Sequence, residues 1–170
     1  IIADCHIKGE KDETIILQSH TCHPHMANDG FAGTSIMIRL MQNLMSKKNL
    51  FSYRLILCPE HLGTIFYLNQ IDSNEINNFV GGVFSEMLGS SSYITMGSTF
   101  WGNHYLDSVM GHVGKFYLEE FKMLPFRQTV GNDETVWESP GYEIPFVQIN
   151  RTKKFGFPFE EYHSSLDTPD

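Results

Sequence analysis

Short apolar runs and amphipathic segments alternate along the chain. Six runs bounded by turn-forming residues predict β-strands, at residues 1–7, 14–19, 53–58, 80–84, 93–95 and 145–149. Apolar residues at helical spacing predict three helices, at residues 34–46, 63–70 and 104–120. Gly111 and Gly114 weaken the last of these helices. The segment between the second strand and the first helix is rich in Pro, Asn, Asp and Gly, which predicts a loop.

The order of these elements indicates the class of the fold. Strands and helices alternate through the first half of the chain, which is typical of α/β proteins with a mainly parallel sheet. Ligands of such sheets bind outside the carboxyl ends of the strands. The residues that follow each strand are therefore the first candidates for a functional site.

Composition and charge exclude several classes of protein. The chain has 170 residues, 41% of them apolar, which suffices for one domain with a substantial core. Lys and Arg total 12 against 20 Asp and Glu, a formal charge of -8, so a basic nucleic-acid-binding surface is not expected. No apolar run is long enough to span a membrane. We expect neither nucleic acid nor a membrane as a partner, and the oligomeric state stays open.

Cysteine content and the chain ends bear on location and completeness. Cys5, Cys22 and Cys58 are odd in number and irregularly spaced, which argues against a disulfide framework. The N-terminus has neither the basic patch nor the long apolar stretch of a signal peptide. These features favour the cytoplasm. Because the chain begins at Ile1 without Met and ends in a turn-like segment, we expect residues 1–170 to be a single domain from a longer protein.

Side chains that bind metals or move protons follow four of the predicted strands. They are His20 and Asp29, Glu60 and His61, Glu86, and the segment 160–163 that ends in His163. The carboxyl ends of parallel strands meet at one edge of a sheet, so we expect these residues to converge. Imidazole nitrogen and carboxylate oxygen are ligands that zinc accepts. The sequence therefore predicts a composite metal site at that edge.

Two further features near this edge have open interpretations. His23 and His25 flank Pro24, and either can contact a ligand residue or the substrate, or be a solvated loop residue. The spacing of His20 and His23 is not that of the zinc-binding helix, where the histidines are four residues apart. Four aromatic residues beside His163 form either local core or the wall of a substrate pocket; they are Phe155, Phe157, Phe159 and Tyr162.

Several short blocks occur together, in one order, over nearly the whole chain. They are His20-Thr21-Cys22-His23-Pro24, Asn28-Asp29-Gly30, Gly63-Thr64, Asn132-Asp133-Glu134, Ser139-Pro140-Gly141, and Glu161-Tyr162-His163-Ser164-Ser165 with Asp167. Their order resembles that of the co-catalytic zinc aminopeptidases. It resembles more closely the aminopeptidase-like proteins often found with surface-polysaccharide biosynthesis genes.

The resemblance implies a fold, a cofactor and residue roles. The fold would be a three-layer α/β sandwich with a mainly parallel central sheet, and the cofactor would be one or two zinc ions. Glu60 would be the general base that takes a proton from metal-activated water during amide hydrolysis. The zinc ligands would be His20, Asp29 as the carboxylate that bridges both metals in two-zinc relatives, Glu86 and His163.

Two positions depart from the pattern of the aminopeptidases. Cys22 stands where those enzymes have an Asp that orients the ligand histidine. Their consecutive Glu-Glu pair, base then ligand, corresponds here either to Glu60-His61 or to Pro59-Glu60. In the first register His61 is a ligand of a second zinc. In the second register Glu60 is itself a ligand, and no base remains at the usual place.

Three functions are compatible with these residues. The leading expectation is a zinc-dependent amide or peptide hydrolase of aminopeptidase type, acting on a small peptide or an amide such as that of an amino sugar. The alternatives are a non-catalytic zinc-binding scaffold domain and a glutaminyl-cyclase-like transferase with one zinc.

Overall fold

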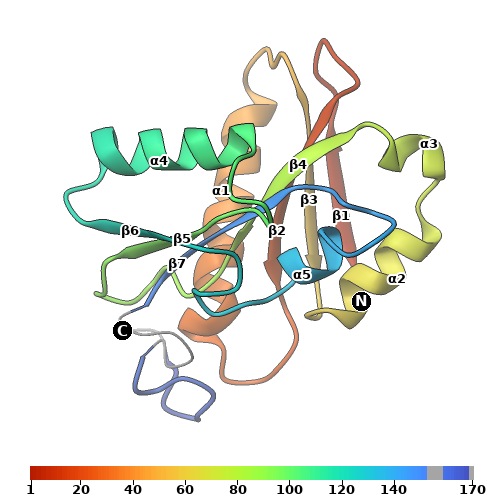
Figure 1. The fold of residues 1–170 in the computed structure, drawn as a ribbon. Helices are drawn as coiled ribbons and strands as arrows, with labels where there is room; N and C mark the ends of the chain where they lie inside the picture. Colours follow the sequence, from red (N-terminus) through yellow and green to blue (C-terminus); the bar gives the residue numbers. More distant parts are fainter. Residues whose placement is uncertain (153–158, 169–170) are drawn as a thin grey trace.

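The computed structural model describes residues 1–152 and 159–168 and contains a seven-stranded sheet (Figure 1). The strand order across the sheet is β1-β3-β2-β4-β7-β5-β6. Neighbouring strands are parallel except in the pairs β1–β3 and β5–β7. The predicted α/β class with a mainly parallel sheet is confirmed. The strands are β1 (Ala3–Ile7), β2 (Thr14–His20), β3 (Ser52–Cys58), β4 (Phe79–Ser85), β5 (Ile94–Gly97), β6 (Phe121–Leu124) and β7 (Phe146–Arg151).

Helices pack on both faces of the sheet. The first face packs against α1 through Leu17 of β2 and Leu55 of β3, and α4 lies on the same face further along. The opposite face packs against α2 and α5 through Ile16 and Ile56. Figure 1 shows α4 over the β5–β6 end of the sheet and α2 beside the β1–β3 end. The helices are η1 (Ala27–Ala32), α1 (Gly33–Met45), α2 (Leu62–Gln70), α3 (Ser73–Ile76), α4 (Tyr105–Tyr117) and α5 (Glu134–Trp137).

The structure differs from the sequence-based expectations at three short elements. The predicted helix over residues 104–120 ends at Tyr117, and the short strand β6 follows it. Residues 73–76 and 134–137, for which no helix or strand was predicted, form single helical turns, α3 and α5. Each of these elements has only four residues, which is too few for a hydrophobic period to be recognised.

A buried polar network lies within the core under α2 and α5. The side-chain nitrogen of Gln18 on β2 donates a hydrogen bond to Thr64 Oγ1 over 2.6 Å. The side-chain oxygen of Gln18 accepts a hydrogen bond from the Trp137 indole N–H. The Trp137 ring stacks on Phe146, with ring centroids 5.0 Å apart. These contacts join β2, β7, α2 and α5 below the carboxyl edge of the sheet.

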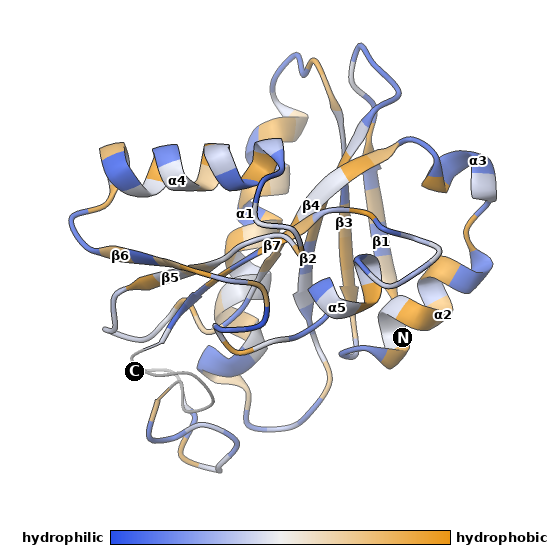
Figure 2. Cartoon of the chain, in the orientation of Figure 1, coloured by the Kyte–Doolittle hydropathy of each residue, from blue (hydrophilic) through white to orange (hydrophobic). Residues whose placement is uncertain are grey.

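The distribution of hydropathy follows this packing. Figure 2 shows hydrophobic residues along the central strands and hydrophilic residues on α3 and in many of the loops. Among the residues described, no helix combines the length and apolar character needed to cross a membrane.

We expect Phe146→Ala to lower the free energy of unfolding by about 3–5 kcal/mol, because it removes a fully buried ring from the Trp137 stack. Urea unfolding followed by circular dichroism measures this loss. Phe66→Ala is the matched control, since Phe66 on α2 is 58% exposed, and its effect should stay within about 0.5 kcal/mol. Equal effects of the two substitutions would contradict the assignment of this core.

Candidate metal centre

The predicted site residues lie at the carboxyl edge of the central strands. His20 is the last residue of β2 and pairs in register with Cys58 at the end of β3. Glu60 follows β3 by two residues, and Glu86 directly follows β4. The register of the parallel strands thus places an imidazole and two carboxyl groups from distant parts of the sequence at one edge.

The first group of possible ligands is buried. The Nε2 atom of His20 lies 3.4 Å from Asp29 Oδ1 and 3.4 Å from Glu86 Oε2. All three residues are at most 1% exposed, and among the described residues His20 Nε2 has no hydrogen-bond partner. Ligand atoms about 2.0–2.1 Å from a tetrahedral zinc ion are separated by about 3.3–3.4 Å. The three side chains therefore fit a zinc ion.

The electrostatics of this group favour a cation. Burial lowers the pKa of His20, but the neighbouring Asp29 and Glu86, together with Glu60, outweigh it and raise the pKa to about 11. Burial also raises the pKa of Glu86, although His20 opposes that shift. Carboxylates removed from water are costly unless positive charge accompanies them. A proton on His20 or a metal ion at Nε2 supplies that charge.

Backbone geometry brings Asp29 to the site. Gly30 has φ +110°, and a Cβ atom there would lie 2.3 Å from Met26 Cε and 2.9 Å from His20 Cε1. Gly33 begins α1 so close to β4 that a Cβ atom would lie 2.4 Å from the Ser85 carbonyl oxygen. Only glycine fits at both positions. The loop therefore turns sharply after Asp29 and lies against the end of β4, directly before Glu86.

The carboxylate of Asp29 also faces a second group. Its Oδ2 atom lies 3.1 Å from His23 Nε2 and 3.1 Å from His163 Nε2, while Oδ1 faces His20. The second group is more open, because the side chains of His23 and His163 are 27% and 53% exposed. The ligand atoms of each group lie within 4.8 Å of one another. Asp29 is common to both groups.

Glu60 lies beside the first group and is held by Asn132. The Asn132 amide nitrogen donates to Glu60 Oε1 over 2.6 Å and to Glu86 Oε2 over 3.0 Å. The backbone N–H of Asn132 donates in turn to the buried carboxyl of Glu134, whose pKa burial raises to about 8. One amide group thus fixes Glu60 relative to Glu86.

The other nitrogen of His20 has its own partners. The Nδ1 atom lies 3.3 Å from Cys22 Sγ and 3.6 Å from Glu60 Oε1. A proton on Nδ1 that is shared with these acceptors leaves Nε2 unprotonated, as a metal ligand requires. Cys22 therefore lies beside the His20 imidazole, as the resemblance led us to expect for the residue at this position.

Asp167 holds the loop that carries Asp29. Its two carboxylate oxygens accept the backbone N–H groups of Asn28 and Asp29 over 2.9 and 3.0 Å. The side-chain oxygen of Asn28 accepts a hydrogen bond from the Gly89 N–H over 2.7 Å. Because Asp167 follows His163 by four residues, it ties the segment that carries His163 to the loop that carries Asp29.

Other predicted residues lie outside these groups. His61 is exposed, and its backbone N–H donates to Asp133 over 2.9 Å. Three groups of possible ligand atoms are found among the described residues, the third being His20, Cys22 and His23, and none contains His61. Of the aromatic residues, Phe155 and Phe157 lie outside the described part of the chain. Phe159 contacts Tyr162, with ring centroids 5.7 Å apart, and Tyr162 stacks on His163.

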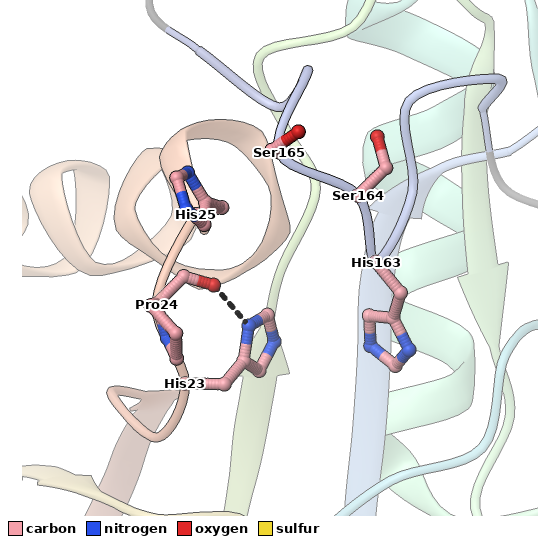
Figure 3. Close-up of a pocket in the computed structure, with 6 residues that line it drawn as sticks. All are labelled: His23, Pro24, His25, His163, Ser164 and Ser165. Carbon is pink, nitrogen blue, oxygen red and sulfur yellow. Dashed lines mark hydrogen bonds between the residues drawn. The ribbon is translucent and has the colours of Figure 1, made fainter.

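An open pocket of about 430 Å³ adjoins the second group (Figure 3). Figure 3 shows the imidazoles of His23 and His163 on opposite sides of it. The residues that line it are His23, Pro24, His25, His163, Ser164 and Ser165. The pocket therefore lies beside the two imidazoles that contact Asp29.

Comparison with models of known protein families shows to which family the chain belongs. The model of a family described as a domain of unknown function, DUF4910, matches residues 1–170. The chain belongs to the DUF4910 family.

Relatives of this DUF4910 domain carry names that agree with the predicted resemblance. A Clostridium acetobutylicum protein named for polysaccharide biosynthesis and an aminopeptidase-like domain is 29% identical over 167 residues. The match covers 95% of this chain and 36% of that protein, so the chain spans about a third of the relative. The predicted resemblance to aminopeptidase-like proteins associated with polysaccharide biosynthesis is confirmed.

Solved structures share the fold of the DUF4910 domain. A crystal structure described as a peptidase from C. acetobutylicum has a TM-score of 0.90 at 27% identity, covering 98% of this chain and 38% of that one. A zinc aminopeptidase from Bacillus subtilis has a TM-score of 0.79 at 18% identity, covering 98% and 43%. An Acidobacteriales glutaminyl cyclase has a TM-score of 0.71 at 18% identity, covering 98% and 65%. The fold is thus that of zinc aminopeptidases, and glutaminyl cyclases share it.

Sequence reasoning gave no role to two residues that the structure brings into the site. Asn132 holds two carboxylates, and Asp167 holds the Asp29 loop. For His23, whose role was left open, the structure shows contact with the predicted ligand Asp29. Asn132 and Asp167 stand in blocks that carry the resemblance, which was the available signal. Their contacts span from 46 to 139 residues of sequence, so no local pattern reveals them.

We expect Asp167→Ala to weaken zinc binding by about 10–100-fold, because the Asp29 loop loses both of these backbone anchors although none of the predicted ligand residues is replaced. Equilibrium dialysis of the metal-free protein against zinc measures the change. Glu10→Ala removes an exposed carboxylate from a turn far from the site and serves as the control. Equal zinc affinity in the two variants would refute the positioning role of Asp167.

Proposed function

We propose that this domain is a zinc-dependent hydrolase of amide or peptide bonds, of aminopeptidase type, built on a three-layer arrangement of helices and sheet. The observation that carries the proposal is the buried Nε2 atom of His20, equidistant from two carboxylates and without a hydrogen bond among the described residues. His20, Asp29 and Glu86 would hold the ion. Three protein ligands and an open position are typical of catalytic rather than structural zinc sites.

The residues around the ion have distinct tasks. Bound zinc supplies a Lewis acid that polarises an amide carbonyl and lowers the pKa of water to about 7. Asn132 anchors Glu60 through Oε1, whereas Oε2 takes part in none of the hydrogen bonds found among the described residues. Glu60 is 31% exposed at its side chain. Its Oε2 atom can therefore take a proton from attacking water and return it to the leaving amine.

The substrate proposed is a small peptide or a small amide. The pocket beside His23 and His163 has the volume for a ligand of that size, and it is lined by imidazoles and hydroxyls rather than by a large apolar wall. The name of the C. acetobutylicum relative adds polysaccharide biosynthesis as a context, which makes an amino-sugar amide a second candidate substrate. We place this activity in the cytoplasm, without nucleic acid or a membrane as a partner.

Two alternatives have specific support. A glutaminyl-cyclase-like transferase with a single zinc is supported by the shared fold of the Acidobacteriales enzyme. A non-catalytic zinc-binding scaffold is supported by Cys22, a weaker hydrogen-bonding partner for the ligand imidazole than a carboxylate. A panel of aminoacyl amides, N-acyl amino sugars and N-terminal glutaminyl peptides, assayed with zinc-loaded protein, separates the three. Release of an amine or an acid would support the hydrolase. Formation of pyroglutamate would support the cyclase, and the absence of turnover would support the scaffold.

We expect Glu60→Gln to retain zinc but to lower turnover by about 10²–10⁴-fold, because glutamine keeps the bond to Asn132 and cannot accept the proton. Zinc content by elemental analysis and turnover of the best substrate of the panel are measured together. Glu120→Gln, a change at an exposed residue after α4, is the control. Full activity of Glu60→Gln would refute the base assignment, and loss of its zinc would make Glu60 a ligand.

A further inference from the structure

His23 has the hydrogen-bonding pattern of a metal ligand. Its Nδ1 atom lies 2.9 Å from the carbonyl oxygen of Pro24 (Figure 3). Since a carbonyl oxygen can only accept, this contact requires a proton on Nδ1. Histidines that ligate metals commonly donate their second N–H to a backbone carbonyl in this way.

The opposite nitrogen of His23 then faces a negative partner. In the neutral imidazole the proton on Nδ1 leaves a lone pair on Nε2. That atom lies 3.1 Å from Asp29 Oδ2. A lone pair directed at a carboxylate oxygen is repulsive, so the contact needs a positive charge. The charge is either a second proton on the ring or a cation between the two atoms.

His163 meets the same oxygen from the other side. Its Nε2 atom lies 3.1 Å from Asp29 Oδ2, and its ring centroid lies 5.0 Å from that of His23 at an interplanar angle of 79°. Tyr162 stacks on the His163 ring with centroids 3.8 Å apart and limits its rotation. Two imidazole nitrogens and one carboxylate oxygen therefore converge beside the pocket, which leaves room for further ligands.

We propose that His23, and not the His61 that the resemblance implied, is the ligand that joins Asp29 Oδ2 and His163 at the second, exchangeable metal position, so that the two positions differ in ligand chemistry. The first position has one imidazole and two buried carboxylates. The second has two imidazoles and only the shared carboxylate, and it opens into the pocket of about 430 Å³. The proposal concerns binding alone and does not require that the domain be a hydrolase.

This difference has consequences for metal choice and exchange. Imidazole ligands suit zinc, cobalt, nickel and copper, whereas sites dominated by carboxylate and water suit magnesium and manganese. The second position should therefore discriminate strongly against manganese. Because His23 and His163 are partly exposed, an ion there should also leave for a chelator in solution before the ion held by the buried group.

Zinc titration of the metal-free protein by isothermal calorimetry, with dialysis to count bound ions, tests the proposal. The wild type should bind two ions per chain with separate affinities, and His23→Asn should bind only the tighter one. His25→Asn is the matched control, since His25 is exposed in the same pocket, lies outside both ligand groups and has φ +54°, which asparagine tolerates. Two ions in His23→Asn, or one or none in the wild type, would overturn the proposal. A wild type that binds two ions but hydrolyses nothing would refute only the proposed function.

A second variant covers the case in which His23→Asn does not fold. His23→Asp offers a carboxylate at the same place, so it should keep two ions while the preference of the weaker position moves toward manganese by at least about tenfold. Competition between zinc and manganese, followed by elemental analysis, measures the ratio. An unchanged ratio at the weaker position would show that His23 is not a ligand and would overturn the proposal.

Discussion

The buried carboxylates of Asp29 and Glu86 impose the constraint on which the rest of the centre depends. Two such groups within 3.4 Å of one imidazole nitrogen, all at most 1% exposed, are stable only if positive charge accompanies them. The fold holds these carboxylates instead of letting them move apart. The Asn132 amide bridges Glu86 to Glu60, and the Gly30 turn fixes the direction of Asp29. Much of the polar structure at this edge of the sheet therefore keeps negative charge in place, which is what a cation site would require.

The sequence predicted the fold well where hydrophobic patterns are long enough to be recognised. The apolar runs of β2, β3, β4 and β7 and the amphipathic pattern of α1 all correspond to observed elements. The four-residue elements β6 and α5 were missed, because tertiary contacts rather than a local period determine them. The π-helical turn over Ala27–Ala32 was expected to be a loop, and its non-helical residues Asp29 and Gly30 explain why.

The metal centre was predictable in part. His20, Asp29, Glu86 and His163 were selected because they follow strands and match a family pattern, and the structure brings their side chains together. The role of His23 was left open, because its spacing from His20 is not diagnostic of a metal site. The structure shows why spacing is a poor guide, since β2 ends at His20 and the chain then turns, so that both imidazoles face Asp29. The role of Asn132 depends on contacts with distant carboxylates, which spacing cannot show.

The attachment of Asp167 to the backbone of Asn28 and Asp29 also bears on how the domain folds. These bonds join residues up to 139 positions apart and so close a loop that contains most of the described chain. Closing so long a loop costs chain entropy before any bond repays it, and contacts of this separation generally slow folding. The sheet can form without this closure, whereas the loop of Asp29 becomes anchored only when the last segment docks. The candidate metal centre would therefore be completed late, once the last segment docks, and an ion that bound only the closed form would draw the folding equilibrium toward it.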